Sequence, residues 1–199
     1  MELLPSLLST GWATGVNAYL TVVVLGLAGR AGVGEVPDQL SETPVLAVAG
    51  LMFAVEFVTD KVPYLDNAWD AIHTAIRPAI ASLIGVGYAD ADGLAGLDEA
   101  LAGGGSGALA LVSHAVKASL RLGINASPEP FSNILASLTE DGLVAAVTAL
   151  SLEHPELAAA IAVVLLVLGI VLVVVIWRRI RSALRAFIER TRRPPPRPG

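Results

Sequence analysis

The chain has 199 residues, of which 54% are hydrophobic and only 16% are charged, and its net charge is −5. Its mean hydropathy of +0.68 places it on the membrane side of ordinary soluble composition. Because the chain contains no cysteine, disulfides, thiolate metal sites and cysteine nucleophiles are excluded.

Apolar segments follow one another along the chain and predict an all-α, polytopic transmembrane helical bundle of about six spans. The expected spans cover residues 3–29, 44–60, 69–88, 107–123 and 130–152, and a sixth begins near Pro155 and continues into the tail. The sixth contains the uncharged stretch 157–177, which at about 20 apolar residues is long enough to cross a bilayer.

The acidic, glycine-rich segment 90–106 predicts a flexible linker between two halves of a transmembrane domain, 1–89 and 107–177. Three spans in each half favour a 3+3 inverted repeat, in which the halves have opposite orientations. The alternative is a coincidental likeness between apolar helices.

Eight arginines and one glutamate follow Trp177, so the tail 178–199 carries a net charge of +7. Basic residues that flank an apolar span mark its cytoplasmic side. With six spans, both termini are then expected in the cytoplasm, with the chain in a bacterial plasma (inner) membrane. We expect 178–185 to continue the sixth helix along the lipid surface and the final PPPRPG to be extended or disordered.

Charged pairs of opposite sign occupy two similar motifs. AVEFVTDKVPYLDNAWDAIHTAIRP contains Glu56 and Asp60, and HAVKASLRLGINASPEPFSNILASLTED contains Lys117 and Arg121. Charges at bilayer depth are costly and usually face a bundle interior or a cavity. Because opposite charges can offset one another's desolvation, we expect Lys117 to neighbour Glu56 or Asp60.

A second pairing is predicted near the middle of two other spans, where Arg77 and the carboxylates Glu140 and Asp141 lie. Arg77 is expected within ion-pair reach of one of these carboxylates. Such a pair is either a static contact that sets helix register or part of a transport or proton-relay site.

Further polar residues complete the predicted intramembrane site. Asp70 and His73 share a helix face with Arg77, and His73 and His114 are each candidates for proton transfer or for simple packing. Asn17 needs a polar partner, and Asn125 lies in the break NASPEP. That break and PYLDN are each interpreted as a capped loop or as a re-entrant break that faces a ligand. No dense set of metal ligands is present, so neither a metal nor a cofactor is expected.

The motifs TGVNAYL, VEFVTDKVPYLDNAWDAIHTAIRP and KASLRLGINASPEPFSNILASLTED resemble a bacterial integral membrane family catalogued as domain of unknown function 4126. The resemblance covers nearly the whole chain up to the basic tail. It implies an integral membrane protein and brings no established activity.

The leading functional hypothesis is a small transporter or channel with a charged intramembrane site, with proton coupling as one form of it. The competing hypothesis is a structural or lipid-interacting membrane protein with static ion pairs. A membrane-embedded enzyme acting on lipid is a weaker third class, since soluble-enzyme motifs are missing. Expected partners are membrane lipids and a small solute or ion, without nucleic acid, and a homo-oligomer is left open.

Overall fold

The computed structural model describes residues 3–125 and 131–192, which form seven α-helices and one short 3-10 helix and contain no strand. The elements are α1 (Leu3–Val16), α2 (Ala18–Arg30), η1 (Asp38–Ser41), α3 (Thr43–Thr59), α4 (Pro63–Ala91), α5 (Leu97–Asn125), α6 (Phe131–Glu153) and α7 (Pro155–Arg192). The prediction of an all-α chain is therefore confirmed.

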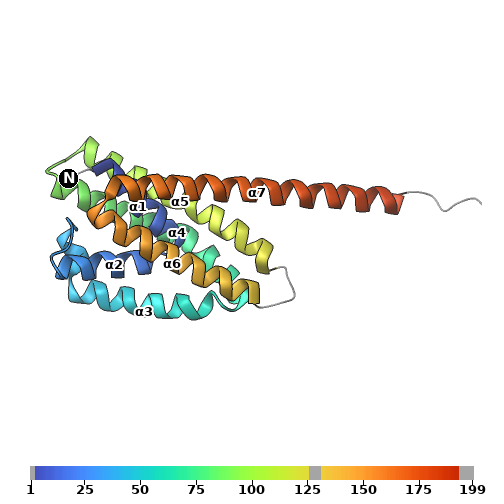
Figure 1. Cartoon of the computed structure of the whole chain (residues 1–199), viewed down its shortest axis with the longest axis horizontal. Coiled ribbons are helices and arrows are strands. Elements are labelled where there is room, and N and C mark those ends of the chain that lie inside the picture. The colour runs from blue at the N-terminus through green and yellow to red at the C-terminus, as the bar shows by residue number, and fades with distance from the viewer. Residues whose placement is uncertain (1–2, 126–130, 193–199) are drawn as a thin grey trace, which may run out of the picture.

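The expected first span, 3–29, is two helices that form a hairpin. Asn17 has extended backbone angles (φ −148°, ψ 100°), and its side chain accepts a hydrogen bond from Leu20 N at 3.0 Å, which caps α2. Residues near the start of α1 pack in one apolar cluster with Val22 and Leu25 of α2, so α2 turns back beside α1 (Figure 1). The expectation of a single crossing was wrong, because a one-residue break does not interrupt the apolar composition on which it was based.

The helices from α3 to α7 run lengthwise and alternate in direction. The α3–α4 turn, the end of α5, the start of α6 and the end of α7 lie toward one end of the molecule, and the start of α1 lies at the other (Figure 1). α7 has 38 residues and extends well beyond its neighbours. Its helix continues through residues 178–185, as predicted, whereas PPPRPG lies outside the described residues.

The predicted flexible linker is largely helical, because α5 begins at Leu97. Two of its glycines allow α5 to approach α4 closely. A Cβ at Gly103 would lie 2.7 Å from Val86 Cγ2, and one at Gly107 would lie 3.0 Å from the Pro78 carbonyl oxygen. Small residues at such contacts let helix backbones pack tightly. Glycine here therefore indicates helix packing, and the composition alone suggested flexibility instead.

The two predicted breaks differ in their outcome, because the chain turns before PYLDN whereas α5 ends within NASPEP. PYLDN is helical, since α4 begins at Pro63, and the chain turns instead at residues 60–62. In NASPEP, Asn125 is the last residue of α5, and the five residues that follow lie outside the described part. The described residues of α5 to α7 contain no broken helix equivalent to the α1–α2 hairpin, so the inverted repeat gains no support from them.

Polar side chains fill much of the interior while large apolar ones face outward. The buried polar set includes Glu56, Arg77 and Arg121, each with no exposed surface. The exposed apolar set runs along α3 to α7 and is densest on α7. Among the described residues, Phe131–Glu153 and Pro155–Ser182 are long and apolar enough to cross a membrane. A soluble protein would place these two kinds of side chain the other way round.

Candidate functional site

Nine ionisable side chains from α3, α4, α5 and α6 converge in the interior, and we call them the charge network. Its members are Glu56, Asp60, Asp66, Asp70, Arg77, Lys117, Arg121, Glu140 and Asp141. All are buried except Glu140 and Asp141, which are half-buried. Six carboxylates face three cations, and Lys61 at the edge of the network interacts with Asp141 and offsets a further charge. Carboxylates therefore outnumber cations at the site.

Arg77 forms one end of the network. Its Nη2 donates to Glu56 Oε1 at 2.7 Å and lies 3.3 Å from Asp70 Oδ1. The predicted pairing of Arg77 with Glu140 or Asp141 was therefore wrong. Equal depth along two spans does not say which helix faces which, and α4 turns Arg77 toward α3 rather than toward α6.

Lys117 and Arg121 form the other end, one helical turn apart on α5. Lys117 Nζ lies 3.2 Å from Asp60 Oδ2 and 3.8 Å from Glu56 Oε1, which confirms the predicted neighbours. Arg121 Nε donates to Glu140 Oε2 at 3.1 Å, and its Nη2 reaches Asp60 Oδ2 at 3.4 Å. Asp60 therefore lies between both cations and links α3 to α5.

The break between α1 and α2 contacts the charge network directly. The last carbonyls of a helix have no partner within it and carry partial negative charge. Here the Gly15 carbonyl accepts from Arg77 Nη1 at 3.1 Å, and the Val16 carbonyl accepts from Lys117 Nζ at 3.1 Å. Asn17 Nδ2 donates to Asp141 Oδ1 at 2.9 Å, so the predicted polar partner of Asn17 is present.

Gly15 shows why the hairpin reaches so deep. A Cβ on this residue would lie 2.7 Å from Ser113 Cβ and 2.9 Å from the Ala110 Cα on α5. Only glycine permits that approach, which brings the end of α1 within reach of Lys117.

The two histidines of the site differ in their capacity to take up a proton. Arg77 Nη1 lies 2.8 Å from His114 Nδ1, and because a guanidinium only donates, that ring nitrogen is an acceptor. The hydrogen of His114 is then on Nε2, which donates to the Asp70 carbonyl oxygen at 2.9 Å. A second proton on this ring would face Arg77, so His114 is fixed as neutral.

His73 is free of that restriction. Its Nδ1 donates to the Trp69 carbonyl oxygen at 2.8 Å, and its Nε2 lies 2.9 Å from the Tyr19 hydroxyl. A hydroxyl both donates and accepts, so this contact survives in the neutral and the protonated ring. The Trp69 ring also stacks on His73 with centroids 4.4 Å apart. Of the two predicted relay candidates, only His73 has the geometry for the role.

Three asparagines extend the network toward the end of α5 and the start of α6. Asn125 Nδ2 donates to Asp66 Oδ2 at 2.7 Å and to Asn67 Oδ1 at 2.7 Å. Asn133 Nδ2 donates to the Asp60 carbonyl oxygen at 2.9 Å, and its own side-chain oxygen accepts from Arg121.

Sequence reasoning missed four contributors to the site. Asn133 could have been found from its spacing with Ser137 and Glu140, which puts all three on one face of a helix. Asp66 lies in PYLDN, which the sequence predicted to be a break and not part of the charged site. Tyr19 and Trp69 carried no signal beyond their aromatic character.

Several buried carboxylate oxygens of the network have no hydrogen-bond partner within the described residues. They include Glu56 Oε2, Asp60 Oδ1 and Asp70 Oδ2. Such atoms are uncommon in protein interiors and costly to bury. No group of three or more histidine, aspartate or glutamate side chains in the described ranges is arranged to hold a metal ion.

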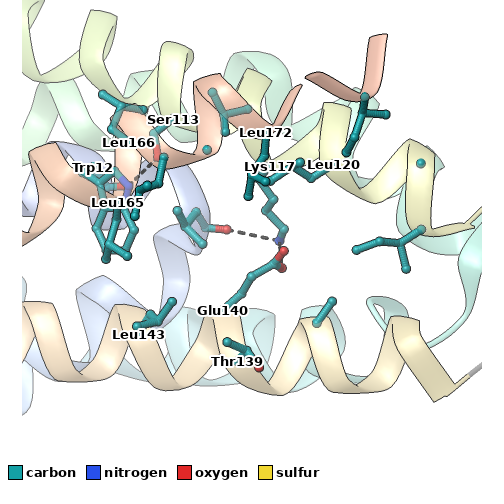
Figure 2. A pocket seen from close by; sticks show the side chains of 18 of the residues that line it. Trp12, Ser113, Lys117, Leu120, Thr139, Glu140, Leu143, Leu165, Leu166 and Leu172 are labelled. Carbon is teal, nitrogen blue, oxygen red and sulfur yellow. Dashed lines mark hydrogen bonds and ion pairs between the residues drawn. The ribbon is translucent and has the colours of Figure 1, made fainter. Parts of the chain in front are cut away.

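A cavity of about 850 Å³ adjoins the network between α5, α6 and α7 (Figure 2). Most of its wall is aliphatic. Lys117 points into it from α5 and Glu140 from α6, and these two side chains approach each other across it (Figure 2). Glu140, whose side chain is 20% exposed, is therefore where the charge network meets open space.

The chain belongs to the family described as Domain of unknown function (DUF4126), which matches residues 4–175. Comparison with curated proteins finds no match. Comparison with solved structures also finds none. What the site does must therefore be argued from its own geometry.

Proposed function

We propose that this chain is an integral membrane protein with five crossing helices, α3 to α7, and a re-entrant hairpin formed by α1 and α2. The polar interior and apolar exterior support this arrangement. Length supports it too: α4 and α5 have 29 residues each, which is about 44 Å of helix against a hydrocarbon core of about 30 Å. At 17 residues, α3 covers about 25 Å and would cross with little tilt.

This topology changes one expectation from the sequence. A hairpin that enters and leaves on one side adds no crossing, so the two termini would lie on opposite sides of the membrane. The arginines of α7 favour the cytoplasm for the C-terminus. Lys61 in the α3–α4 turn and Arg121 near the end of α5 lie toward the same end of the bundle. The N-terminus would then face outward, from a bacterial plasma membrane.

The activity we propose is transport of a small solute, coupled to protons, through the charge network. The observation that carries this proposal is the excess of carboxylates over cations in the largely buried network, beside a broken helix. A network that served only to hold helices together would gain nothing from unbalanced charge, because each unpaired buried carboxylate is costly. In transporters, broken helices whose ends face the midplane are where substrates and coupling ions bind.

The network also has a carboxylate that can take up a proton from the cavity. Glu140 faces the cavity, and through Arg121 and Lys117 it connects to Asp60 and then to Glu56. A proton taken up by Glu140 would release Arg121 and Lys117 to pair more closely with Asp60. Charge uptake at the cavity would thereby alter contacts that join α3, α5 and α6.

The test is a flux screen in proteoliposomes with a trapped pH-sensitive dye, across imposed pH gradients and a panel of small cations and anions. We expect at least one solute to accelerate the pH change over protein-free liposomes. Glu140→Gln should reduce that rate at least tenfold, and the exposed Glu156→Gln on α7 should leave it unchanged. No acceleration by any solute, or equal rates for the two variants, would overturn the proposal.

The competing hypothesis of a static, structural network makes a different prediction for exchanged charges. If Glu56 and Arg77 merely hold α3 to α4, the double variant Glu56→Arg with Arg77→Glu should keep the activity of the parent wherever it folds. The exchange also disturbs the contacts with Lys117, Asp70 and the Gly15 carbonyl, so folding is first checked by size-exclusion chromatography. Under the transport proposal, this variant folds but loses coupled flux. A folded variant with full flux would favour the static interpretation.

A further inference from the structure

The cavity between α5, α6 and α7 has the composition of a ligand site. Its volume of about 850 Å³ falls within the range of about 300–1,000 Å³ that small-molecule sites occupy. Such sites are mostly apolar, with a few polar groups that fix orientation. Here the apolar wall includes Leu120, Leu135, Leu165 and Leu172, and Trp12 of α1 adds an aromatic ring to it. Glu140 is at its centre (Figure 2).

The polar groups on the wall differ in how far they are already engaged. Lys117 Nζ donates to the Val16 carbonyl and to Asp60, and it has two further carboxylates within 3.8 Å. Glu140 uses only Oε2, toward Arg121 and Lys117. Its Oε1 has no hydrogen-bond or ion-pair partner among the residues the structure describes. The available group is therefore a carboxylate oxygen, and the cation beside it is fully occupied.

The charge around the cavity also favours a cation as its occupant. Apart from Glu140, the network has five carboxylates and three cations, so an anion entering the cavity would meet net negative charge and a cation would relieve it. A small hydrated cation would leave the aliphatic wall unfilled, and a neutral apolar molecule would leave Glu140 uncompensated. The occupant that satisfies both features has a single positive charge and a large apolar surface.

We propose that this cavity binds a hydrophobic monocation, whose charge lies against Glu140 Oε1 and whose apolar groups fill the space between α5, α6 and α7. The inference rests on the proposed function and deepens it, because it names the class of solute that reaches the charge network. A lipid acyl chain is the alternative occupant of the same space, and it would leave Glu140 Oε1 without a partner.

Two ions of the same shape and opposite charge separate these occupants. Tetraphenylphosphonium and tetraphenylborate present the same four phenyl rings, so an apolar cavity alone would accept both. Binding is measured by equilibrium dialysis of the whole purified chain in detergent against matched protein-free micelles. We expect saturable binding of tetraphenylphosphonium, at least tenfold tighter than that of tetraphenylborate. Tetramethylammonium, which has the charge without the apolar surface, should compete only weakly.

Variants address the charge and the space separately. Glu140→Gln keeps the shape of the side chain and should weaken tetraphenylphosphonium binding about tenfold or more, as expected for loss of a charged contact. Gly123 lines the cavity, and a Cβ there meets nothing within 4 Å, so Gly123→Leu adds an apolar side chain at the cavity wall without a backbone clash. It should weaken binding even where Glu140 is intact.

The matched control is Gly142→Leu. Gly142 is also helical and exposed, a Cβ on it also meets nothing within 4 Å, and it does not line the cavity. This variant should bind as the parent does. Equal affinity for the two tetraphenyl ions, unchanged binding in Glu140→Gln, or equal loss in the two leucine variants would overturn the inference.

The outcome is independent of the transport measurement, because dialysis involves no gradient. Binding of tetraphenylphosphonium without any coupled flux would overturn the proposed transport and leave the site. Coupled flux of other solutes without tetraphenylphosphonium binding would overturn the proposed binding site and leave the proposed transport.

Discussion

Removal of the Arg77 guanidinium should destabilise the protein strongly, and only one second substitution should repair the damage. Arg77 and Glu56 are both fully buried, with 2.7 Å between Nη2 and Oε1. Truncation of one partner leaves the other charge buried and unpaired, which costs about 3–5 kcal/mol. For a chain of this size each kcal/mol lowers Tm by about 2–4 °C, so Arg77→Met should lower the apparent Tm by about 10 °C.

The double variant Arg77→Met with Glu56→Met removes both charges and should recover a substantial part of that loss. Recovery should be incomplete, since Arg77 also donates to the Gly15 carbonyl and lies 3.3 Å from Asp70. The measurement is a double-mutant cycle of thermal unfolding in one detergent, followed by intrinsic fluorescence and by size-exclusion chromatography of the heated samples.

The control uses the partner that the sequence alone favoured. Glu140 contacts Arg121 and Lys117 rather than Arg77, so Arg77→Met with Glu140→Gln should be no more stable than Arg77→Met alone. If the Glu140 combination recovers stability and the Glu56 combination does not, the assigned pairing is refuted. Strict additivity in both cycles would show that neither carboxylate is coupled to Arg77.

Three further outcomes can be checked independently. Reporters fused at the two chain ends should lie on opposite sides of the membrane, because the α1–α2 hairpin adds no crossing; the same side for both would restore a six-span topology. Asn17→Ala removes a helix cap and the amide that donates to Asp141, and it should lower the free energy of unfolding by about 1–3 kcal/mol. Asn67→Ala, at a half-buried position that only accepts from Asn125, should lower the free energy of unfolding by less. Nitrogen NMR of labelled histidine should find the hydrogen of His114 on Nε2 and that of neutral His73 on Nδ1, and the reverse assignment for His114 would contradict the role given to Arg77.

Local composition was enough to identify most of the helices and the charged residues that lie in the interior. Apolar stretches predicted α3, α6 and the start of α7 to within a residue, since each stretch is a property of neighbouring residues. They placed the starts of α4 and α5 too late, by 6 and 10 residues, because the first turns of those helices are polar or rich in glycine. The high cost of burying a charge was sufficient to identify Glu56, Asp60, Lys117 and Arg121 as interior partners. These inferences hold because they depend only on spacing along one helix and on the energetics of a single side chain.

Other features depended on contacts between helices and could not be inferred from the sequence. The glycine-rich stretch of α5 resembles a linker until α4 is placed against Gly103 and Gly107. A single asparagine in an apolar stretch resembles a tolerated polar residue until Asn17 is seen to reverse the chain, with its neighbours' carbonyls held by Arg77 and Lys117.

The sequence by itself determined an all-α chain with charges that must be buried together, because hydropathy and charge are properties of each residue. Only the tertiary structure decided which charges pair, which way the first helix turns and where the interior stays open. Those outcomes depend on how each helix is rotated about its own axis. Rotation is set by the packing of side chains from distant segments, as in the contact that turns Arg77 toward Glu56 and leaves Glu140 facing the cavity.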